Sequence, residues 1–188
     1  MRLLYLSHPE VNIDAEVPVP KWGLSKLGQA RMRALAGRGW PGPGWRIISS
    51  PEVKAMETAQ LIAGGTLVEQ EPRSGEVDRT STGYLPHDQH EAQADRLFGA
   101  PDESAQGWER AVDAQARMVT IAKEILAEGR DTLLVGHGAV GTFLWCASAG
   151  RAIARVADQT SGGQLWAMHR SASGWQVDHA WQPIEELA

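Results

Sequence analysis

Cysteine is nearly absent from this chain of 188 residues, which contains only Cys146. A single cysteine cannot form an internal disulfide, and it cannot supply a cysteine-based zinc site. This usage is typical of proteins from a reducing compartment, and we expect a cytoplasmic location. Because Cys146 lies in an apolar helical stretch, we expect a buried and inert thiol rather than a nucleophile.

Long apolar runs and an excess of positive charge are also missing. No stretch is long enough to span a membrane, so we expect no membrane partner. The formal net charge of −5 argues against a general nucleic-acid binder, whereas a small anionic ligand needs only a few local cations. The hydrophobic fraction of 43% argues against a disordered or fibrous chain. Since no linker is evident, we expect one domain over residues 1–188.

The order of the apolar segments predicts an α/β fold with three layers. Strand-like runs alternate with helical ones, which implies a mostly parallel sheet covered by helices on both faces. Near the C-terminus, two alternating segments flank a Ser-Ala-Ser-Gly turn and predict a hairpin at the sheet edge. The expected strands are 3–6, 45–49, 66–70, 131–136, 164–170 and 175–181, and the expected helices are 25–36, 52–63, 87–98, 108–128 and 139–149.

Two histidines follow directly after predicted strands. His8 follows the first strand, and His137 follows the fourth, between Gly136 and Gly138. Open α/β sheets bind ligands at the carboxyl ends of their strands, so both side chains are expected to converge on one crevice. The glycines would allow a ligand or the backbone to approach the ring closely. A histidine at a strand end, taken alone, is more often a structural hydrogen-bonding residue.

Two other segments carry polar chemistry. Ser49-Ser50-Pro51, followed by Lys54, marks a helix start after the second strand, where free N–H groups and the lysine charge favour phosphate. A capped helix with a surface lysine is the alternative. Glu76 and Arg79 lie in a loop without periodicity and offer a proton donor and a guanidinium, or else a solvated salt bridge. His87 and His90 lie one turn apart on a polar helix, where we expect solvated side chains.

Together these segments resemble the histidine phosphatase superfamily, which has the phosphoglycerate mutase-like fold. Its members carry Arg-His-Gly after the first strand, Ser-Ser-Pro with a following Arg after the second, a Glu in a mid-chain loop, and a late His-Gly. The resemblance covers about residues 1–150, in order and spacing. The matching stretches are Ser7-His8-Pro9, Ser49-Ser50-Pro51 with Lys54 and Glu57-Thr58-Ala59, Gly75-Glu76, Gly136-His137-Gly138, and a first helix at Leu24–Ala30.

The resemblance implies a metal-independent phosphatase that hydrolyses a phosphomonoester through a phosphohistidine on His8. Glu76 would be the proton donor, and His137 would complete the catalytic set. No cofactor is implied, and no metal, because no third ligand accompanies the two histidines. The expected partner is a small phosphorylated substrate, with a cap or specificity segment at about 80–105. The implied phosphate-binding residues are Ser7, Lys54, Arg79 and Gly138.

The chain departs from the family pattern at both phosphate arginines, which are Ser7 and Lys54 here. Lysine offers a point charge in place of the rigid fork of arginine, and one lost donor can lower a rate by ~10²–10³. We hypothesise that Arg79 returns a guanidinium to the pocket. The alternative is a catalytically impaired member that binds a phosphorylated ligand or a partner protein. A third hypothesis is an interaction protein that uses its Trp-rich C-terminal hairpin.

Overall fold

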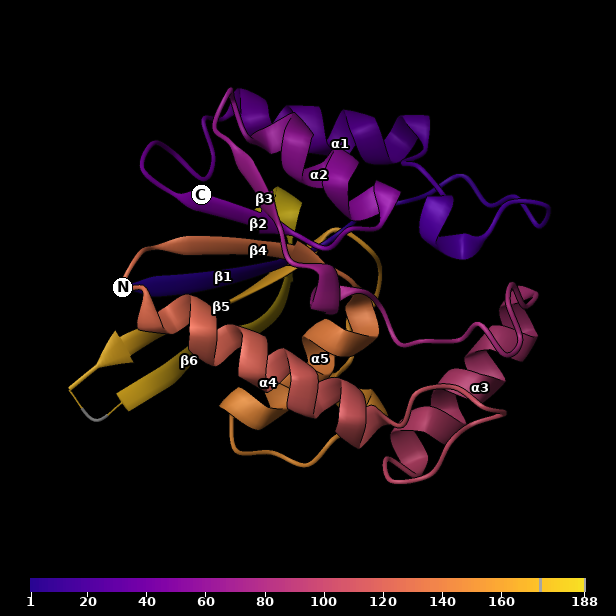
Figure 1. Ribbon diagram of the computed structural model, residues 1–188. Helices are drawn as coiled ribbons and strands as arrows, with labels where there is room; N and C mark the ends of the chain where they lie inside the picture. The colour runs from indigo at the N-terminus through magenta and orange to yellow at the C-terminus, as the bar shows by residue number, and fades with distance from the viewer. Residues whose placement is uncertain (173, 188) are drawn as a thin grey trace.

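The computed structural model describes residues 1–172 and 174–187, and its six strands form one mixed sheet with the order β3-β2-β4-β1-β5-β6 (Figure 1). The four strands β1 to β4 run parallel, whereas β5 is antiparallel to β1 and β6 to β5. The predicted α/β class with a C-terminal edge hairpin is therefore confirmed. The bounds are β1 Arg2–Ser7, β2 Arg46–Ser49, β3 Val68–Gln70, β4 Thr132–Gly136, β5 Gln164–Ser171 and β6 Gly174–Pro183.

Helices cover both faces of the sheet, which gives the predicted three layers. In Figure 1, α1 and α2 lie above the sheet and α4 and α5 below it, while α3 lies beyond the carboxyl ends of the parallel strands. The helices are α1 Lys26–Gly37, α2 Val53–Ile62, α3 His87–Gly99, α4 Ala111–Ala127 and α5 Gly138–Ser148. Short 3₁₀ turns are η1 Val19–Lys21, η2 Pro72–Ser74, η3 Arg155–Ala157 and η4 Ile184–Glu186.

Local chemistry explains where two helices begin. The Ser25 hydroxyl accepts the Gly28 N–H at 3.1 Å and caps α1. The long helix α4 was expected from Trp108 but begins at Ala111. The segment before it is held by other bonds: the Trp108 indole donates to the Thr82 hydroxyl at 2.9 Å, and the Glu109 N–H donates to the Asp78 carbonyl at 2.8 Å. These bonds tie the start of α4 to the loop that carries Glu76.

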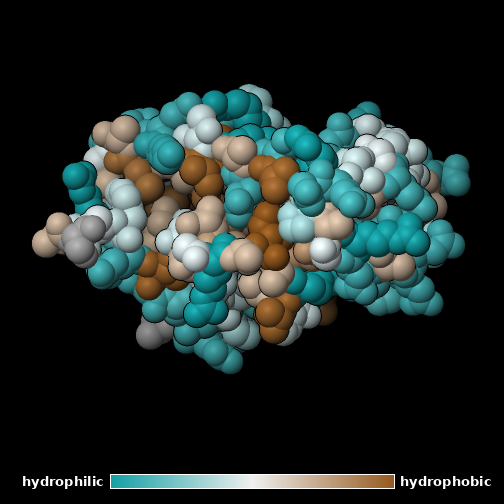
Figure 2. Space-filling model, turned by 90° about the horizontal axis from the view of Figure 1, so that it is seen from below, coloured by the Kyte–Doolittle hydropathy of each residue, from teal (hydrophilic) through white to brown (hydrophobic). Residues whose placement is uncertain are grey.

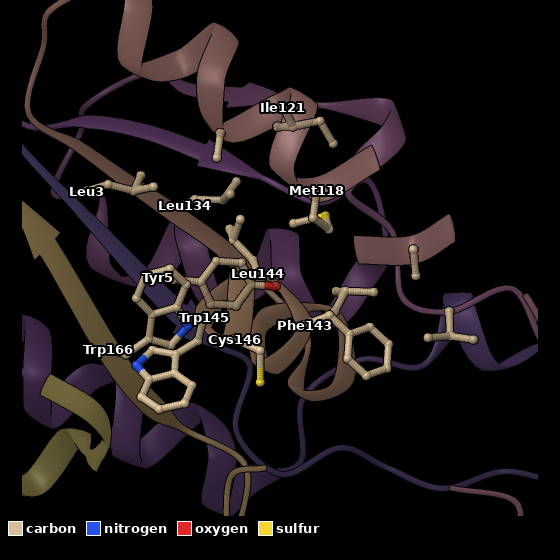
Figure 3. Close-up of a cluster of buried hydrophobic side chains, with 14 of the residues drawn as sticks. Leu3, Tyr5, Met118, Ile121, Leu134, Phe143, Leu144, Trp145, Cys146 and Trp166 are labelled. Carbon is tan, nitrogen blue, oxygen red and sulfur yellow. The ribbon is translucent and has the colours of Figure 1, made fainter. Parts of the chain in front are cut away.

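Tyr5 on β1 lies in a dense core between the sheet and the two lower helices. Figure 3 shows its ring near Trp166 of β5, with Met118 and Ile121 of α4 above it and Cys146 of α5 below it. The Tyr5 and Trp166 rings stack with their centroids 5.5 Å apart, and Cys146 is buried in the same cluster, as predicted. Close packing of this kind resists small displacements. It therefore fixes the positions of β1 and β4 at the edge of the sheet where His8 and His137 lie.

Apolar side chains also reach one face of the surface. Viewed from below, they gather over the side of the molecule that carries α5 and the hairpin, whereas the side that carries α3 is mostly hydrophilic (Figure 2). A hollow of about 590 Å³ lies between α5 and β6, lined by residues that include Trp145, Trp175 and Val177. Within the described part of the chain, no helix is both long and apolar enough to cross a membrane.

Candidate active site

The two histidines lie side by side, as the sequence predicts. Ser7 pairs with Gly136 in the parallel β1–β4 register, so His8 and His137 are the next residues on neighbouring strands. The His8 N–H donates to the Gly136 carbonyl at 3.0 Å. The ring centroids of His8 and His137 are 5.3 Å apart. The expected convergence is therefore confirmed.

The His8 ring is held in one protonation form. Its Nδ1 forms a hydrogen bond with the Pro9 carbonyl at 2.8 Å. Because a carbonyl only accepts, Nδ1 must donate, and the neutral ring then keeps a lone pair on Nε2. Burial and, after it, the charge of Lys54 lower the pKa of His8 to about 4. Near neutral pH this residue is therefore an uncharged imidazole with an available Nε2.

His137 is fully buried and bonded from both sides. The Tyr5 hydroxyl donates to its carbonyl at 3.1 Å and accepts its N–H at 3.0 Å. A hydrogen bond of 2.7 Å joins its Nε2 to the Ser50 hydroxyl. Burial lowers the pKa of His137 well below its usual value. Ser50 thus points into the site rather than only marking the end of a strand.

Replacing Tyr5 with phenylalanine should destabilise the protein by about 1–3 kcal/mol, because the buried His137 N–H would lose its acceptor. The His137 carbonyl keeps the Gly141 N–H at 3.2 Å, so the N–H carries most of the loss. Urea unfolding of the variant measures the effect, and Tyr84→Phe, at a half-exposed position, is the control. Equal stability of wild type and Tyr5→Phe would contradict this account.

Glu76 projects a buried carboxyl group between the loops. Its Oε1 accepts the N–H of Val77 at 3.0 Å and that of Val140 at 3.3 Å. Burial raises the pKa of Glu76, although the Arg79 charge and these N–H groups oppose the rise. A carboxyl group with a raised pKa retains its proton at a higher pH than usual, as a proton donor requires.

Lys54 is not a free surface lysine. Its side chain is only 3% exposed, and its ammonium group pairs with the Glu52 carboxylate and donates to the Val19 carbonyl at 3.0 Å. Glu52 also accepts the Glu76 N–H at 2.9 Å. An ammonium group has three protons, and these two bonds use two of them. Sequence reasoning missed Glu52, for which the only signal was a carboxylate two residues before Lys54.

Arg79 lies among aromatic and imidazole groups. Its guanidinium donates to the His90 Nε2 and lies over the Trp108 ring at 5.9 Å from the centroid. His90 is only partly solvated, because the loop that carries Arg79 folds against α3. Burial and the charge of Arg79 lower the pKa of His90. Trp108 and His90 were both missed as site residues, since only the tertiary contact selects them.

Ser7 and Gly138 occupy different surroundings. Ser7 is fully buried, where its hydroxyl donates to the Gln164 carbonyl at 3.2 Å and accepts the Gln164 N–H at 3.1 Å. Gly138 begins α5, and a Cβ atom there would lie 2.4 Å from the Gln159 Nε2. The hydroxyl of Ser7 is thus engaged with β5, whereas Gly138 lines the same cavity as His8.

Two cavities meet at this site. The first, of about 550 Å³, lies between the loops at 15–20 and 76–84, and the second, of about 370 Å³, reaches His8. Glu76 and Arg79 line both. The lining of the first includes Glu16, Glu52 and Asp78, and the lining of the second includes His90, Trp108, Gly138, Arg155 and Gln159. In residues 1–172 and 174–187, no three His, Cys, Asp or Glu side chains cluster in a way that could hold a metal ion.

Solved structures with a similar fold include several phosphatases. The mycobacterial glucosyl-3-phosphoglycerate phosphatase shares 21% identity, with a TM-score of 0.80 over 97% of this chain and 98% of that one. The Entamoeba histolytica phosphoserine phosphatase, solved with 3-phosphoglyceric acid, shares 14%, with a TM-score of 0.80 over 96% of each chain. Bacillus stearothermophilus YhfR shares 21%, with a TM-score of 0.79 over 94% of this chain and 95% of that one. At these identities the likeness establishes a common fold.

Sequence comparison is more specific about the family. No curated protein sequence matches the chain. The family model of the histidine phosphatase superfamily (branch 1) matches residues 16–180. This match includes Glu76 and His137, and it begins after His8. Since it spans most of the chain, the protein belongs to the histidine phosphatase superfamily, branch 1.

Proposed function

We propose that the protein is a metal-independent phosphatase that hydrolyses a phosphomonoester through a phosphohistidine on His8. The observation that carries this proposal is the state of the His8 ring, whose Nδ1 bonds to the Pro9 carbonyl while burial keeps the ring neutral. Its Nε2 lone pair is therefore available as a nucleophile, without a preceding loss of a proton. His8 also lines the 370 Å³ cavity together with Glu76 and Arg79.

The reaction has two steps. Nε2 of His8 attacks phosphorus while the bond to the ester oxygen breaks, and the Glu76 carboxyl gives its proton to that oxygen. Water then attacks the phosphohistidine, the P–N bond breaks, and the Glu76 carboxylate takes the proton of the water. The second step returns both groups to their starting forms, so His8 is regenerated and Glu76 is protonated again.

Developing charge on the phosphoryl oxygens requires positioned donors. The third proton of Lys54, the Arg79 guanidinium, the His137 Nε2 side and the backbone at Gly138 are the groups we assign to this role. We leave Ser7 out of the donor set, since its hydroxyl is bonded to Gln164. Arg79 would then supply the planar fork that the family places elsewhere.

Hydrolysis of an aryl phosphate in excess chelator tests the proposal. The expected result is release of phenol and phosphate in equal amounts, at a rate that added chelator does not change. Purification from a host without other phosphatases, or subtraction of a mock preparation, removes background. No release from a folded protein, over a panel of aryl and alkyl phosphates, would contradict the proposal.

A binding protein without turnover is the second candidate, and specific contacts favour it. Ser7 is engaged in the sheet, and Lys54 is paired with Glu52, so both positions at which the family carries a phosphate arginine hold a weaker or occupied donor. Tight binding of inorganic phosphate without hydrolysis of any panel member would select this function. Binding and hydrolysis together would select the phosphatase.

Replacing Arg79 with alanine should lower kcat/KM by ~10²–10³, because a donor to the transferred phosphoryl group is lost. Steady-state hydrolysis of the aryl phosphate measures this effect. Arg110→Ala is the matched control, since Arg110 is half-exposed and pairs with Asp113 away from the site. Unchanged kcat/KM and phosphate affinity in Arg79→Ala would show that Arg79 does not compensate for the missing arginines.

A further inference from the structure

A carboxylate lies among the groups that we assign to phosphate binding. Glu52 precedes α2 and is only 10% exposed. Its side chain pairs with Lys54, accepts the Glu76 N–H at 2.9 Å, and lies 3.5 Å from the His137 Nε2. It also lines the 550 Å³ cavity. Glu52 therefore shares its partners with any anion that enters.

Glu52 carries a negative charge under ordinary conditions. Burial by itself favours the neutral carboxyl group, but the adjacent His137 ring, the charge of Lys54 and the Glu76 N–H outweigh burial and lower the pKa of Glu52 to about 2. An ionised carboxylate can only accept hydrogen bonds. A ligand group beside Glu52 is thus favoured if it offers a proton and disfavoured if it brings only charged oxygens.

The other charges at the site sum to a small positive value. Arg79 lines both cavities, and Lys54 adds a second cation through its pair with Glu52. Burial favours the neutral forms of His8 and His137 by lowering their pKa values, and burial favours the protonated form of Glu76 by raising its pKa. With these three groups in their neutral forms, the charges of Lys54, Arg79 and Glu52 leave one positive charge in excess. A singly charged ligand balances it, whereas a doubly charged ligand leaves an uncompensated charge in a partly desolvated pocket.

The remaining charged neighbours are screened by water or paired, and Arg155, which lines the His8 cavity, forms ion pairs with Glu91 and Asp158 of the same lining. Glu16 and Asp78 line the same cavity but are exposed at its mouth, where water screens them. Arg117 donates to the Glu76 carbonyl at 3.1 Å, and its guanidinium is paired with Glu109. The Arg117–Glu109 pair is neutral as a unit and adds no net charge behind the loop.

We propose that Glu52 is a specificity-determining residue that makes the site select the singly charged form of a phosphoryl group. That form keeps one P–OH, which can donate to the Glu52 carboxylate, while its other oxygens face Lys54 and Arg79. The doubly charged form has no proton to offer. Both forms of a phosphomonoester exist near neutral pH, because its second ionisation lies at about pH 6. The inference rests on the proposed function only in placing the phosphoryl group in this pocket.

Binding of inorganic phosphate and sulfate to the intact protein tests the inference. At about pH 5, phosphate is mainly singly charged and protonated, whereas sulfate is doubly charged and has no proton. Both titrations use the same pH, so the free protein has the same protonation state in each. Calorimetry should show phosphate bound at least about tenfold more tightly than sulfate, a difference of about 1.4 kcal/mol. Equal affinities for wild type would overturn the proposal without any variant.

The variant Glu52→Gln should reverse this preference. Glutamine has nearly the same shape but no charge, and its amide donates to an anion, so sulfate should bind at least about tenfold more tightly than to wild type. Glu16→Gln removes a charge from the mouth of the same cavity and should keep the wild-type ratio. Weaker binding of both anions to Glu52→Gln would mean that Glu52 only positions Lys54. An equal effect of Glu16→Gln would mean that the overall charge of the cavity, rather than contact with Glu52, sets the selectivity. Either result would overturn the proposal.

Turnover is measured separately from this selectivity. A protein that selects phosphate over sulfate but hydrolyses no ester would keep the inference and contradict the phosphatase proposal. An active phosphatase that binds both anions equally would keep the proposed function and overturn the role of Glu52. Improved sulfate binding in Glu52→Gln cannot result from partial unfolding, because unfolding lowers affinity.

Discussion

Replacing His8 with alanine is expected to lower hydrolysis of an aryl phosphate by a factor on the order of 10³ or more, since the nucleophile of the first step is lost. Alanine leaves no ring nitrogen near the phosphorus, and water lacks the position that the Pro9 carbonyl gives to the imidazole. Steady-state rates of wild type and variant measure the loss. His169→Ala is the control, because His169 lies on β5 and pairs with Asp178.

The same experiment can identify the intermediate. Wild type mixed with excess substrate and quenched in alkali should carry one phosphoryl group, located on His8 by mass spectrometry of its peptides. His8→Ala should carry none, and His169→Ala should carry the same amount as wild type. A variant that keeps its activity, or a phosphoryl group on another residue, would contradict the role of His8.

Replacing Glu76 with glutamine should lower the rate by ~10²–10⁴ for an alkyl phosphate. The loss should be smaller for a nitrophenyl phosphate, because that leaving group departs as an anion with little need of a proton. The comparison of the two substrates measures proton donation rather than folding. Glu103→Gln, at an exposed position in the loop before α4, is the control. Equal losses for both substrates would contradict the assignment.

The pH profile tests the same pair of groups. His8 must be neutral to attack, so activity should fall as the pH drops through its lowered pKa of about 4. Glu76 must be protonated in the first step, so activity should fall as the pH rises through its pKa, which burial raises. Activity is therefore expected between these two values, and Glu76→Gln should lose the alkaline limb. A profile of the variant with an unchanged alkaline limb would assign that limb to another group.

The positions of the two histidines followed from local sequence pattern. Short apolar runs define β1 and β4, and a parallel pair of strands places the residues after them at one edge. Ser25 and the turn residues of the hairpin likewise act through neighbouring backbone groups, so their effects are visible along the chain. These features depend on contacts between residues close in sequence, or on the period of the hydrophobic side chains.

The donor set of the site did not follow from the sequence. A motif identifies Lys54 but does not show that its ammonium is held by Glu52, and polarity suggests a solvated His90 although Arg79 lies against it. The orientation of Ser7 towards Gln164 depends on the pairing of β1 with β5, two strands separated by most of the chain.

The sequence by itself therefore determined the layers of the fold, the family resemblance, and the residues whose side chains could serve the chemistry: His8, Glu76 and His137. Only the tertiary structure decided the charge state of the site and which polar side chains remain free for a ligand. The physical reason is that hydrophobic periodicity and capping act locally, whereas burial and ion pairing depend on what the folded chain places beside each group.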